Sequence, residues 1–417
     1  MYVYVQSRYG EPMMPCSPRK ARILLKENKA TVVRRTPFTI RLRYGSSGYK
    51  QPIVLGVDAG SKTIGMSAST EKQEVFAAAV KPRNDVVEKL SARREMRRAR
   101  RHRNTRYRAP RFENRVCSKH KGWLAPSVEV KIQEHITPIK RICRLLPISK
   151  VIVETAEFDL QLIKAVEKGL PVPVGEDYQK GEMLGFYNVR QYVLFRDHYT
   201  CQCCGAHGTA KKAVKFHVHH IESRKTGGNA PDNLITLCKD CHKLLHVGKI
   251  SLPVKRRGHS SRDATFMGIM RKTLLSRLRD ELDIPVLETR GYFTKYLREQ
   301  HHMEKSHVND ALCIAKHPTA KQTDKVYLIR PVRHHNRQLH KAVYQKGGIR
   351  KSNQAPTYVH GFRLFDKVLY NGQECFVWAR RTSGYFLLRL LDGTKVKDSV
   401  SYKRLTLLER STNYLIA

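Results

Sequence analysis

The sequence is poor in acidic residues. Only 36 Asp and Glu stand against 79 Lys and Arg among 417 residues, which gives a formal net charge of +43 at pH 7. Self-repulsion of this size opposes compaction and solubility unless a polyanion neutralises it, so nucleic acid is the expected partner. Yet 41% of the residues are hydrophobic. That content excludes a disordered basic tail and predicts a folded basic protein, and the length of 417 residues suggests two to four domains.

Long hydrophobic runs are also missing. The longest, such as KVIVE and QPIVLGV, are too short to span a bilayer. The opening MYVYVQSRYG lacks the basic region and apolar stretch of a signal peptide. The ten cysteines form no disulfide framework, since four stand in x-x-spaced pairs and the other six have no pattern. These absences predict a cytoplasmic protein without membrane attachment.

Two Cys-x-x-Cys pairs frame a histidine-rich segment. Cys201, Cys204, Cys238 and Cys241 have the spacing of a closed tetrahedral zinc site. Cys203, within the run CQCC, offers an alternative ligand. Four cytosolic cysteines that pair by chance are the alternative interpretation. The interval between the pairs is longer than a simple ribbon needs, so we expect zinc to staple a small unit that carries an insert.

The segment between the pairs predicts a strand, a turn, a second strand and a helix. HVHHIES places His219 and His220 on opposite faces of the first strand. Such a unit can bring His219, Asn233 and His242 around one divalent ion while His220 faces a water. A neutral imidazole is a competent general base near pH 7, and a metal stabilises charge on the phosphate and leaving oxygen. A zinc ribbon with incidental histidines is the alternative, and the choice between Asn233 and His242 as ligand stays open.

Acidic residues stand at the ends of two apolar strands and on one helix. Asp58 follows the strand in IVLGVDAG, and Glu154 ends the strand in VIVETAEFD. A buried carboxylate is costly unless it is paired or metal-bound. KSHVNDALCIA sets His307 and Asp310 on one helical face. Three such carboxylates can bind two Mg²⁺ ions about 4 Å apart, with His307 assisting proton transfer; singly, each is equally consistent with a structural role.

Residues 86–112 carry arginines on every face of a predicted helix. A helix of this kind cannot pack against one apolar layer, and the guanidinium group grips phosphates bidentately. We therefore expect it between two nucleic-acid strands; the alternative is a solvated charge run that orders only on binding. The candidate phosphate contacts, which include two exposed arginines near the N-terminus, are Arg34, Arg35, Arg93, Arg94, Arg97, Arg98, Arg100, Arg101, Arg103, Arg106 and Arg108.

The order of these segments resembles one family. With PMMP near the N-terminus, one residue from the usual Pro-Leu-Met-Pro, the chain is similar to IscB, transposon-associated RNA-guided DNA endonucleases. The resemblance implies an α/β multidomain protein: an RNase H-like RuvC core split in three, an inserted zinc-stapled ββα HNH domain, an arginine-rich bridge helix and a β-rich C-terminal domain. The implied boundaries are 1–50 for the PLMP-type module, 51–85, 116–185 and 251–325 for RuvC, 86–115 for the bridge helix, 186–250 for HNH, and 326–417 for a domain that contacts the target-adjacent motif and guide RNA.

The resemblance also implies roles. A guide RNA would pair with the target strand of double-stranded DNA, HNH would cut the paired strand with His220 as base and one metal, and RuvC would cut the displaced strand. The implied catalytic residues are Asp58, Glu154, His307, Asp310, His219, His220 and Asn233. Mg²⁺ at both sites, structural Zn²⁺ and guide RNA are the implied cofactors of a monomeric ribonucleoprotein near a bacterial or archaeal nucleoid. The alternatives are an unguided two-site endonuclease and a catalytically inert RNA-binding protein; a transposase fits less well, because of the HNH insert.

Overall fold

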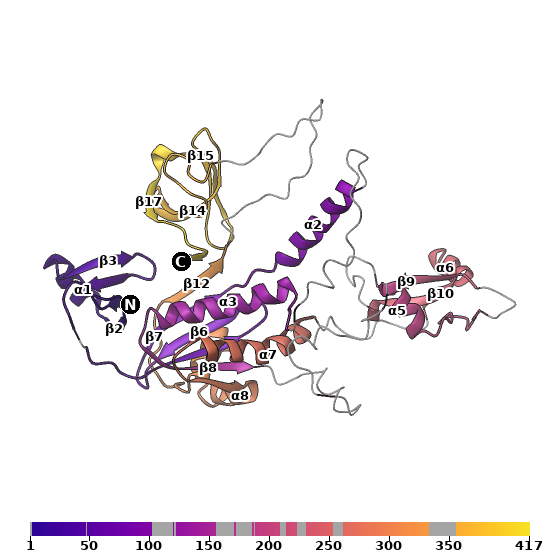
Figure 1. Cartoon of the computed structure of the whole chain (residues 1–417), viewed down its shortest axis with the longest axis horizontal. Helices are drawn as coiled ribbons and strands as arrows, with labels where there is room; N and C mark the ends of the chain where they lie inside the picture. The colour runs from indigo at the N-terminus through magenta and orange to yellow at the C-terminus, as the bar shows by residue number, and fades with distance from the viewer. Residues whose placement is uncertain are drawn as a thin grey trace. The chain divides into compact units, whose positions relative to one another are not determined.

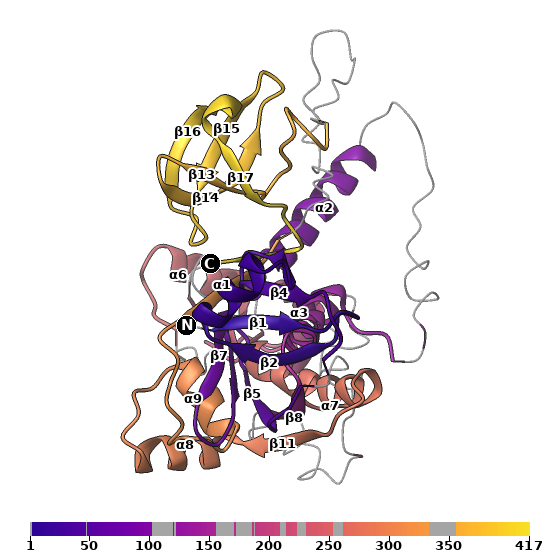
Figure 2. The same cartoon turned by 90° about the vertical axis from the view of Figure 1, so that its left-hand side faces the viewer.

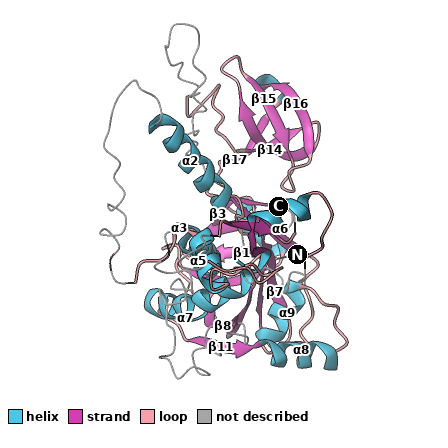
Figure 3. Ribbon diagram, turned by 90° about the vertical axis from the view of Figure 1, so that its right-hand side faces the viewer, coloured by secondary structure: helices cyan, strands magenta, loops and turns pink. Residues whose placement is uncertain are grey.

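The computed structural model describes most of the chain. The described residues are 2–46, 48–101, 120, 122–155, 171, 186, 188–208, 214–222, 231–252, 262–332 and 356–417. The side chains of 96–101, 262–266 and 271 fall outside this description. Two compact units are distinguished, one of Met1–Glu157 with Met270–Ala417 and one of Phe158–Ile269. The chain contains both helices and strands, which makes the protein mixed α/β (Figure 3).

A seven-stranded sheet forms the centre of the first unit (Figure 1). Its order is β11-β8-β5-β6-β7-β12-β18. The strands are β5 (Ile53–Ala59), β6 (Ile64–Ser69), β7 (Glu74–Val80), β8 (Ile148–Thr155), β11 (Val286–Arg290), β12 (Val326–Pro331) and β18 (Tyr414–Ile416). β5, β6 and β7 are successive antiparallel strands, whereas β8 lies parallel to β5 and β11 parallel to β8. The central strands are buried on both faces, which explains their nearly continuous apolar sequences.

Five of the described helices lie between strands of this sheet in the order of the chain. They are α2 (Val86–Arg101), α3 (Pro126–Cys143), α7 (Arg262–Glu281), α8 (Gly291–Gln300) and α9 (His307–Ile314). α3 buries isoleucines at 132, 136, 139 and 142, a spacing that keeps one helical face apolar. The helix predicted over 86–112 is present as α2 as far as Arg101, and 102–112 lie outside the described residues. Among the described residues, no helix combines the length and apolarity needed to cross a membrane.

Two smaller sheets belong to the same unit (Figure 2). The N-terminal sheet, in the order β2-β1-β4-β3, consists of β1 (Val3–Gln6), β2 (Pro12–Cys16), β3 (Ala30–Arg34) and β4 (Thr39–Leu42), with helix α1 (Pro18–Lys26), which the sequence did not predict. The C-terminal antiparallel sheet, in the order β16-β15-β14-β13-β17, consists of β13 (Lys367–Tyr370), β14 (Gln373–Arg380), β15 (Tyr385–Arg389), β16 (Lys395–Ser401) and β17 (Thr406–Glu409). Asn371 and Gly372 both adopt positive φ between β13 and β14, as the predicted hairpin requires.

The second unit contains the histidine-rich segment. Its elements are α5 (Val189–Arg196), β9 (Phe216–His220), β10 (Leu234–Cys238) and α6 (Lys239–His246), with a 3-10 turn at Pro231–Asn233. β9 and β10 pair antiparallel, and α6 follows β10 directly. The two predicted strands and the helix are therefore confirmed, whereas 223–230, which contain most of the predicted turn, lie outside the described residues. Ile235 and Leu237 are buried with three of the four paired cysteines, so the core of this small unit is built on the cysteine cluster.

Candidate functional site

Asp58 and Glu154 lie opposite each other near the carboxyl ends of β5 and β8. The two strands are parallel and pair in register at these residues, and neighbouring strands lie about 4.8 Å apart. On its other side Asp58 is in register with Gly65 of β6. The tertiary structure therefore brings together two carboxylates that are separated by almost a hundred residues in the chain.

Two glycines let helix α9 reach these carboxylates. A Cβ atom on Gly56 would lie 1.9 Å from the backbone oxygen of Ala311, and one on Gly65 would lie 1.8 Å from that of His307. Only residues without a side chain allow the helix backbone to rest directly on β5 and β6. The Ser306 hydroxyl caps the helix by accepting from the Asn309 amide.

The first turn of α9 carries His307 and Asp310 to the same end of the sheet as Asp58 and Glu154. We call the three carboxylates Asp58, Glu154 and Asp310 the acidic edge. His307 Nδ1 lies 2.6 Å from Asp58 Oδ2, and this hydrogen bond raises the pKa of His307 against the opposing effect of burial. Arg298 Nη1 of α8 donates to Asp310 Oδ1 at 2.6 Å. A histidine and an arginine therefore lie against two of the three predicted carboxylates.

Glu154 is held from the other side by α8. The Thr294 hydroxyl donates to Glu154 Oε2. Burial raises the pKa of Glu154, and the nearby charges of Asp58 and Asp310 raise it further. Mutual repulsion of this kind is what a divalent cation relieves. Oxygen ligands that converge from two strands and a helix suit Mg²⁺.

The three carboxylates are less tightly grouped than the ligands of the second unit. Among the described residues, two groups of three or more potential ligands have all their ligand atoms within 4.8 Å of one another. One is the set of four paired cysteines, and the other is a set of three histidines. The oxygens of Asp58, Glu154 and Asp310 do not form a group of this kind among the described residues.

The histidine cluster consists of His219 on β9 and His242 and His246 on α6. Their ring centroids are 4.6 to 5.2 Å apart. Burial lowers the pKa of His219, and the neighbouring His242 and His246 lower it further. The neutral imidazole is the form that binds metal, and three imidazoles placed together fit a divalent ion. His220 follows on β9 and points to the opposite face of the strand.

The described side-chain contacts of Asn233 are with Glu222. The asparagine is completely buried, its Oδ1 accepts from the Glu222 amide at 2.8 Å, and its Nδ2 donates to the Glu222 carbonyl at 3.1 Å. The role of Asn233 beside His219 and His242 stays a prediction, and the structure adds His246, which was not predicted from the sequence, to these histidines. The signal was available, because HKLLH sets two histidines one helical turn apart on α6.

The four paired cysteines meet at the start of α6. Cys204 Sγ lies 3.8 Å from Cys238 Sγ, and the latter caps the helix by accepting from the Cys241 amide. Burial and the neighbouring thiols raise the pKa of Cys241, a cost that a bound cation removes. Four thiolates in this arrangement fit a metal such as zinc, and Cys203 lies outside the group. Such a metal would fix the helix that carries His242 and His246.

Few of the predicted phosphate contacts can be placed. Arg93 and Arg94 are exposed on α2. Arg34 is half-buried rather than exposed, and Arg35 pairs with Glu374 at 3.2 Å, so its charge is already partly neutralised. The other candidates, Arg97, Arg98, Arg100, Arg101, Arg103, Arg106 and Arg108, have side chains outside the described part of the chain.

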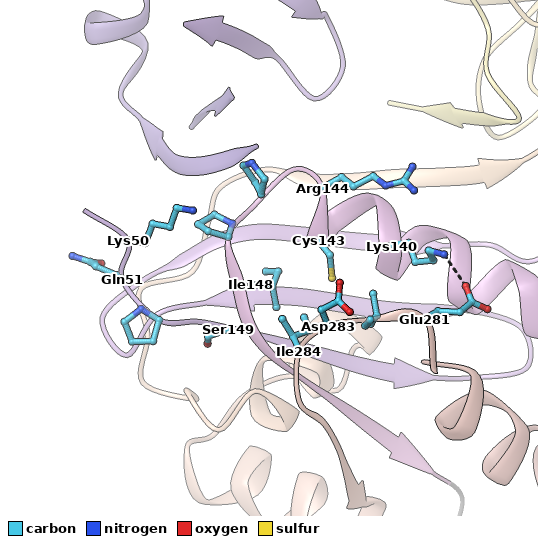
Figure 4. Close-up of a pocket in the computed structure, with 14 residues that line it drawn as sticks. Lys50, Gln51, Lys140, Cys143, Arg144, Ile148, Ser149, Glu281, Asp283 and Ile284 are labelled. Carbon is cyan, nitrogen blue, oxygen red and sulfur yellow. Dashed lines mark hydrogen bonds and ion pairs between the residues drawn. The ribbon is translucent and has the colours of Figure 1, made fainter. Parts of the chain in front are cut away.

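A hollow of about 700 Å³ lies away from the acidic edge, at the amino end of β8 (Figure 4). Ile148 and Ser149 line it together with Lys140, whose ammonium group pairs with Glu281 at 2.7 Å. Glu154 stands at the other end of the same strand. This hollow therefore belongs to neither group of predicted catalytic residues.

Comparison with known proteins identifies two regions. Residues 3–181 match the family described as RRXRR protein, and residues 201–248 match the HNH endonuclease family. A probable HNH endonuclease of Lactococcus phage SK1 is 44% identical over 72 residues, which cover 16% of this chain and 69% of that protein.

Solved Cas9 structures also match. Streptococcus thermophilus Cas9 in complex with the GGAA PAM matches with 15% identity and a TM-score of 0.33, over 50% of this chain and 29% of that one. The type II-C Cas9 from Actinomyces naeslundii matches with 10% identity and a TM-score of 0.20, over 64% of this chain and 60% of that one. The chain thus spans under a third of the Streptococcus protein, and TM-scores of this size do not establish a common fold.

The sequence matches therefore decide the family. The HNH match contains the cysteine and histidine clusters, and the RRXRR match, from a family found in IscB-like and Cas9-like proteins, contains Asp58 and Glu154. The resemblance stated from the sequence is confirmed: the chain belongs to the HNH endonucleases and is an IscB-like protein.

Proposed function

We propose that this protein is an RNA-guided endonuclease of double-stranded DNA with two separate cutting sites. The observation that carries the proposal is the presence of two different sets of nuclease-type ligands in two different compact units. One set is the acidic edge with Asp58, Glu154 and Asp310, and the other is the histidine cluster beside His220. A net charge of +43 supports a nucleic-acid scaffold held mainly through phosphates.

The first site corresponds to a RuvC nuclease on an RNase H-like core. The strand order supports this, because the antiparallel trio β7-β6-β5 continues into parallel β8 and β11. Asp58, Glu154 and Asp310 would hold two Mg²⁺ ions, which stabilise the attacking and leaving oxygens of the phosphodiester when bound. His307, held by Asp58 at 2.6 Å, would orient the attacking water or move its proton. The predicted domain boundaries are part of this proposal.

The second site corresponds to the HNH centre. His219, His242 and His246 would hold one divalent ion, which stabilises charge on the phosphate and leaving oxygen when bound. His220, on the opposite face of the strand from His219, would accept a proton from the attacking water as the phosphorus–oxygen bond to the leaving group breaks. Asn233 would act indirectly, since its bonds to Glu222 fix the chain that leaves β9.

Each of the two sites would cut the strand that the resemblance to the IscB family assigns to it. A guide RNA pairs with the target strand, the HNH site cuts that strand, and the RuvC site cuts the displaced one in the cytoplasm of the host. The basic side chains then contact backbones, while base pairing reads the sequence. Exposed arginines of α2 such as Arg93 and Arg94 would lie against these backbones.

Two single substitutions and one sequencing experiment test the proposal. With the protein purified together with its RNA, we expect His220→Ala to cut only the displaced strand and Asp58→Ala to cut only the paired strand. Sequencing the copurified RNA should give one structured species. Loss of both cuts in either folded variant would refute the assignment of two sites.

The alternatives predict different results. An unguided endonuclease would keep full sequence-specific cleavage after ribonuclease treatment and would copurify with random RNA fragments. An inert RNA-binding protein would give the same results before and after both substitutions. Either outcome would replace the guided mechanism.

A further inference from the structure

An apolar hollow adjoins the acidic edge on the side of α8. It has a volume of about 590 Å³, within the range of ~300–1,000 Å³ typical of ligand sites. Edge strand β11, helix α8 and the C-terminal part of α9 form its walls. Figure 2 shows these three elements close together at the end of the first unit. Neither proposed nuclease mechanism uses this hollow.

Aromatic rings of α8 dominate the hollow and are unusually exposed. The exposed fractions are 47% for Tyr292, 50% for Phe293 and 63% for Tyr296. The rings of Tyr292 and Phe293 lie 4.1 Å apart between centroids. Leu287 of β11, also 46% exposed, extends the same apolar surface. Neighbouring exposed apolar side chains of this kind mark a binding surface.

The same hollow has a basic rim. Arg290 and Lys316 line it and are exposed, and neither side chain has a hydrogen bond or ion pair to another described residue. Glu288, the acidic residue of the lining, accepts from the Thr155 hydroxyl at 2.6 Å. Aromatic rings between unneutralised cations are the combination that binds single-stranded nucleic acid, with bases on the rings and phosphates on the cations.

The hollow is continuous with the acidic edge through one helix. Thr294, which lines it, donates to Glu154, and Arg298, one turn later, donates to Asp310. A Cβ on Gly291 would lie 3.2 Å from Glu154 Oε1, so the start of α8 rests against that carboxylate. Tyr292 and Tyr296 are one turn apart on the same helix but on a different face. Helix α8 therefore contacts the carboxylates through Thr294 and Arg298 and presents Tyr292 and Tyr296 to the hollow beside them.

We propose that this hollow is a stacking site for bases of the single DNA strand that is cut at the acidic edge, with Tyr292 and Tyr296 as positioning residues. The proposal rests on the proposed function, which supplies a displaced single strand. Stacked bases would hold the strand against sliding, so that one phosphodiester stays at the carboxylates. Stacking is tolerant of sequence because every base has an aromatic face, as a site for a displaced strand of varying sequence requires.

Two measurements on the full chain test this site. The first is photocrosslinking of an oligo-thymidine that contains 5-iodouracil to an inactive Asp58→Ala, His220→Ala protein, with the crosslinked peptide identified by mass spectrometry. The second compares the affinity for oligo-thymidine with that for an abasic oligonucleotide of the same length and charge. Because both carry the same phosphates, the difference reports the bases alone.

We expect crosslinks on α8 and at least about a five-fold preference for the oligonucleotide with bases, the lower end of what one stacked base contributes. Replacing both Tyr292 and Tyr296 by Ala should remove the crosslink and the preference. Replacing both by Phe should keep them, because the rings remain. Tyr9→Ala is the matched control, since Tyr9 is 84% exposed in the N-terminal sheet module.

Three results would overturn the proposal: crosslinks that map only outside α8, a preference that survives in the double alanine variant, or crosslinks from Tyr296 to copurified RNA but not to DNA. Failure of the proposed function looks different. In that case Asp58→Ala still cuts the displaced strand, whatever the crosslinks show.

Discussion

The close packing of α9 on β6 makes Gly65→Ala a sharp test of the acidic edge. Gly65 is the cross-strand partner of Asp58, and a Cβ there would lie 1.8 Å from His307 O and 2.4 Å from His307 C. Both are backbone atoms, so no rotation of a side chain can relieve the contact. Ordinary contact begins at 3.4 Å, which leaves the helix about 1.6 Å too close.

The consequence falls on the hydrogen bond between His307 and Asp58. A shift of about 1.6 Å away from β6 would lengthen the separation from 2.6 Å to as much as about 4.2 Å, at which the hydrogen bond is lost. A misplacement of about 1 Å costs roughly 100-fold in rate, and overpacking costs about 1–3 kcal/mol of stability. We therefore expect cleavage of the displaced strand to fall at least about 100-fold in Gly65→Ala.

The assay contains its own control. Cleavage of the two strands of one labelled duplex is followed together, and the paired-strand cut, which the proposed function assigns to the other unit, should keep its rate. Gly45→Ala is the matched substitution, because a Cβ at Gly45 meets nothing within 4 Å. If Gly65→Ala unfolded at the same temperature as Gly45→Ala and cut both strands normally, the packing argument would be refuted.

Three further predictions concern protonation, ligands and zinc. In Asp58→Asn the pKa of His307 should fall back toward 6.5, because the hydrogen bond that raises it is weakened; histidine hydrogen–deuterium exchange measures this. With Asp58 present, the interaction of His307 with Asp58 stabilises the folded protein fully below the unfolded pKa of about 6.5. This stabilisation is lost as the pH rises through the raised pKa of His307 in the folded protein. His246→Ala should lower divalent-ion binding to the second unit without unfolding it. Asn233→Ala should instead cost about 1–3 kcal/mol of stability and leave ion binding intact, and calorimetry measures both quantities. An equal loss of ion binding in the two variants would favour Asn233 as a ligand. Cys238→Ser should release zinc and make the second unit sensitive to protease while the first stays resistant, and an unchanged zinc content would contradict the four-cysteine site.

The sequence by itself determined the local elements that carry chemistry. Apolar runs followed by Asp58 and Glu154 predicted two buried strands, and HVHHIES, LITLC and KDCHKLLH predicted the elements of the second unit, because period and capping are local properties. The cysteine spacing likewise predicted a cluster, since ligands two residues apart need only a turn to converge.

Tertiary structure decided which residues meet. The register of β5 with β8 set Asp58 opposite Glu154, and contacts of α8 added Thr294 and Arg298, which no local pattern marks. It also brought His246 to His219 and His242, and it bonded the buried amide of Asn233 to the backbone of Glu222. Such pairings depend on packing between segments far apart in the chain. The periodicity of one segment does not indicate which other segments pack against it in the folded protein.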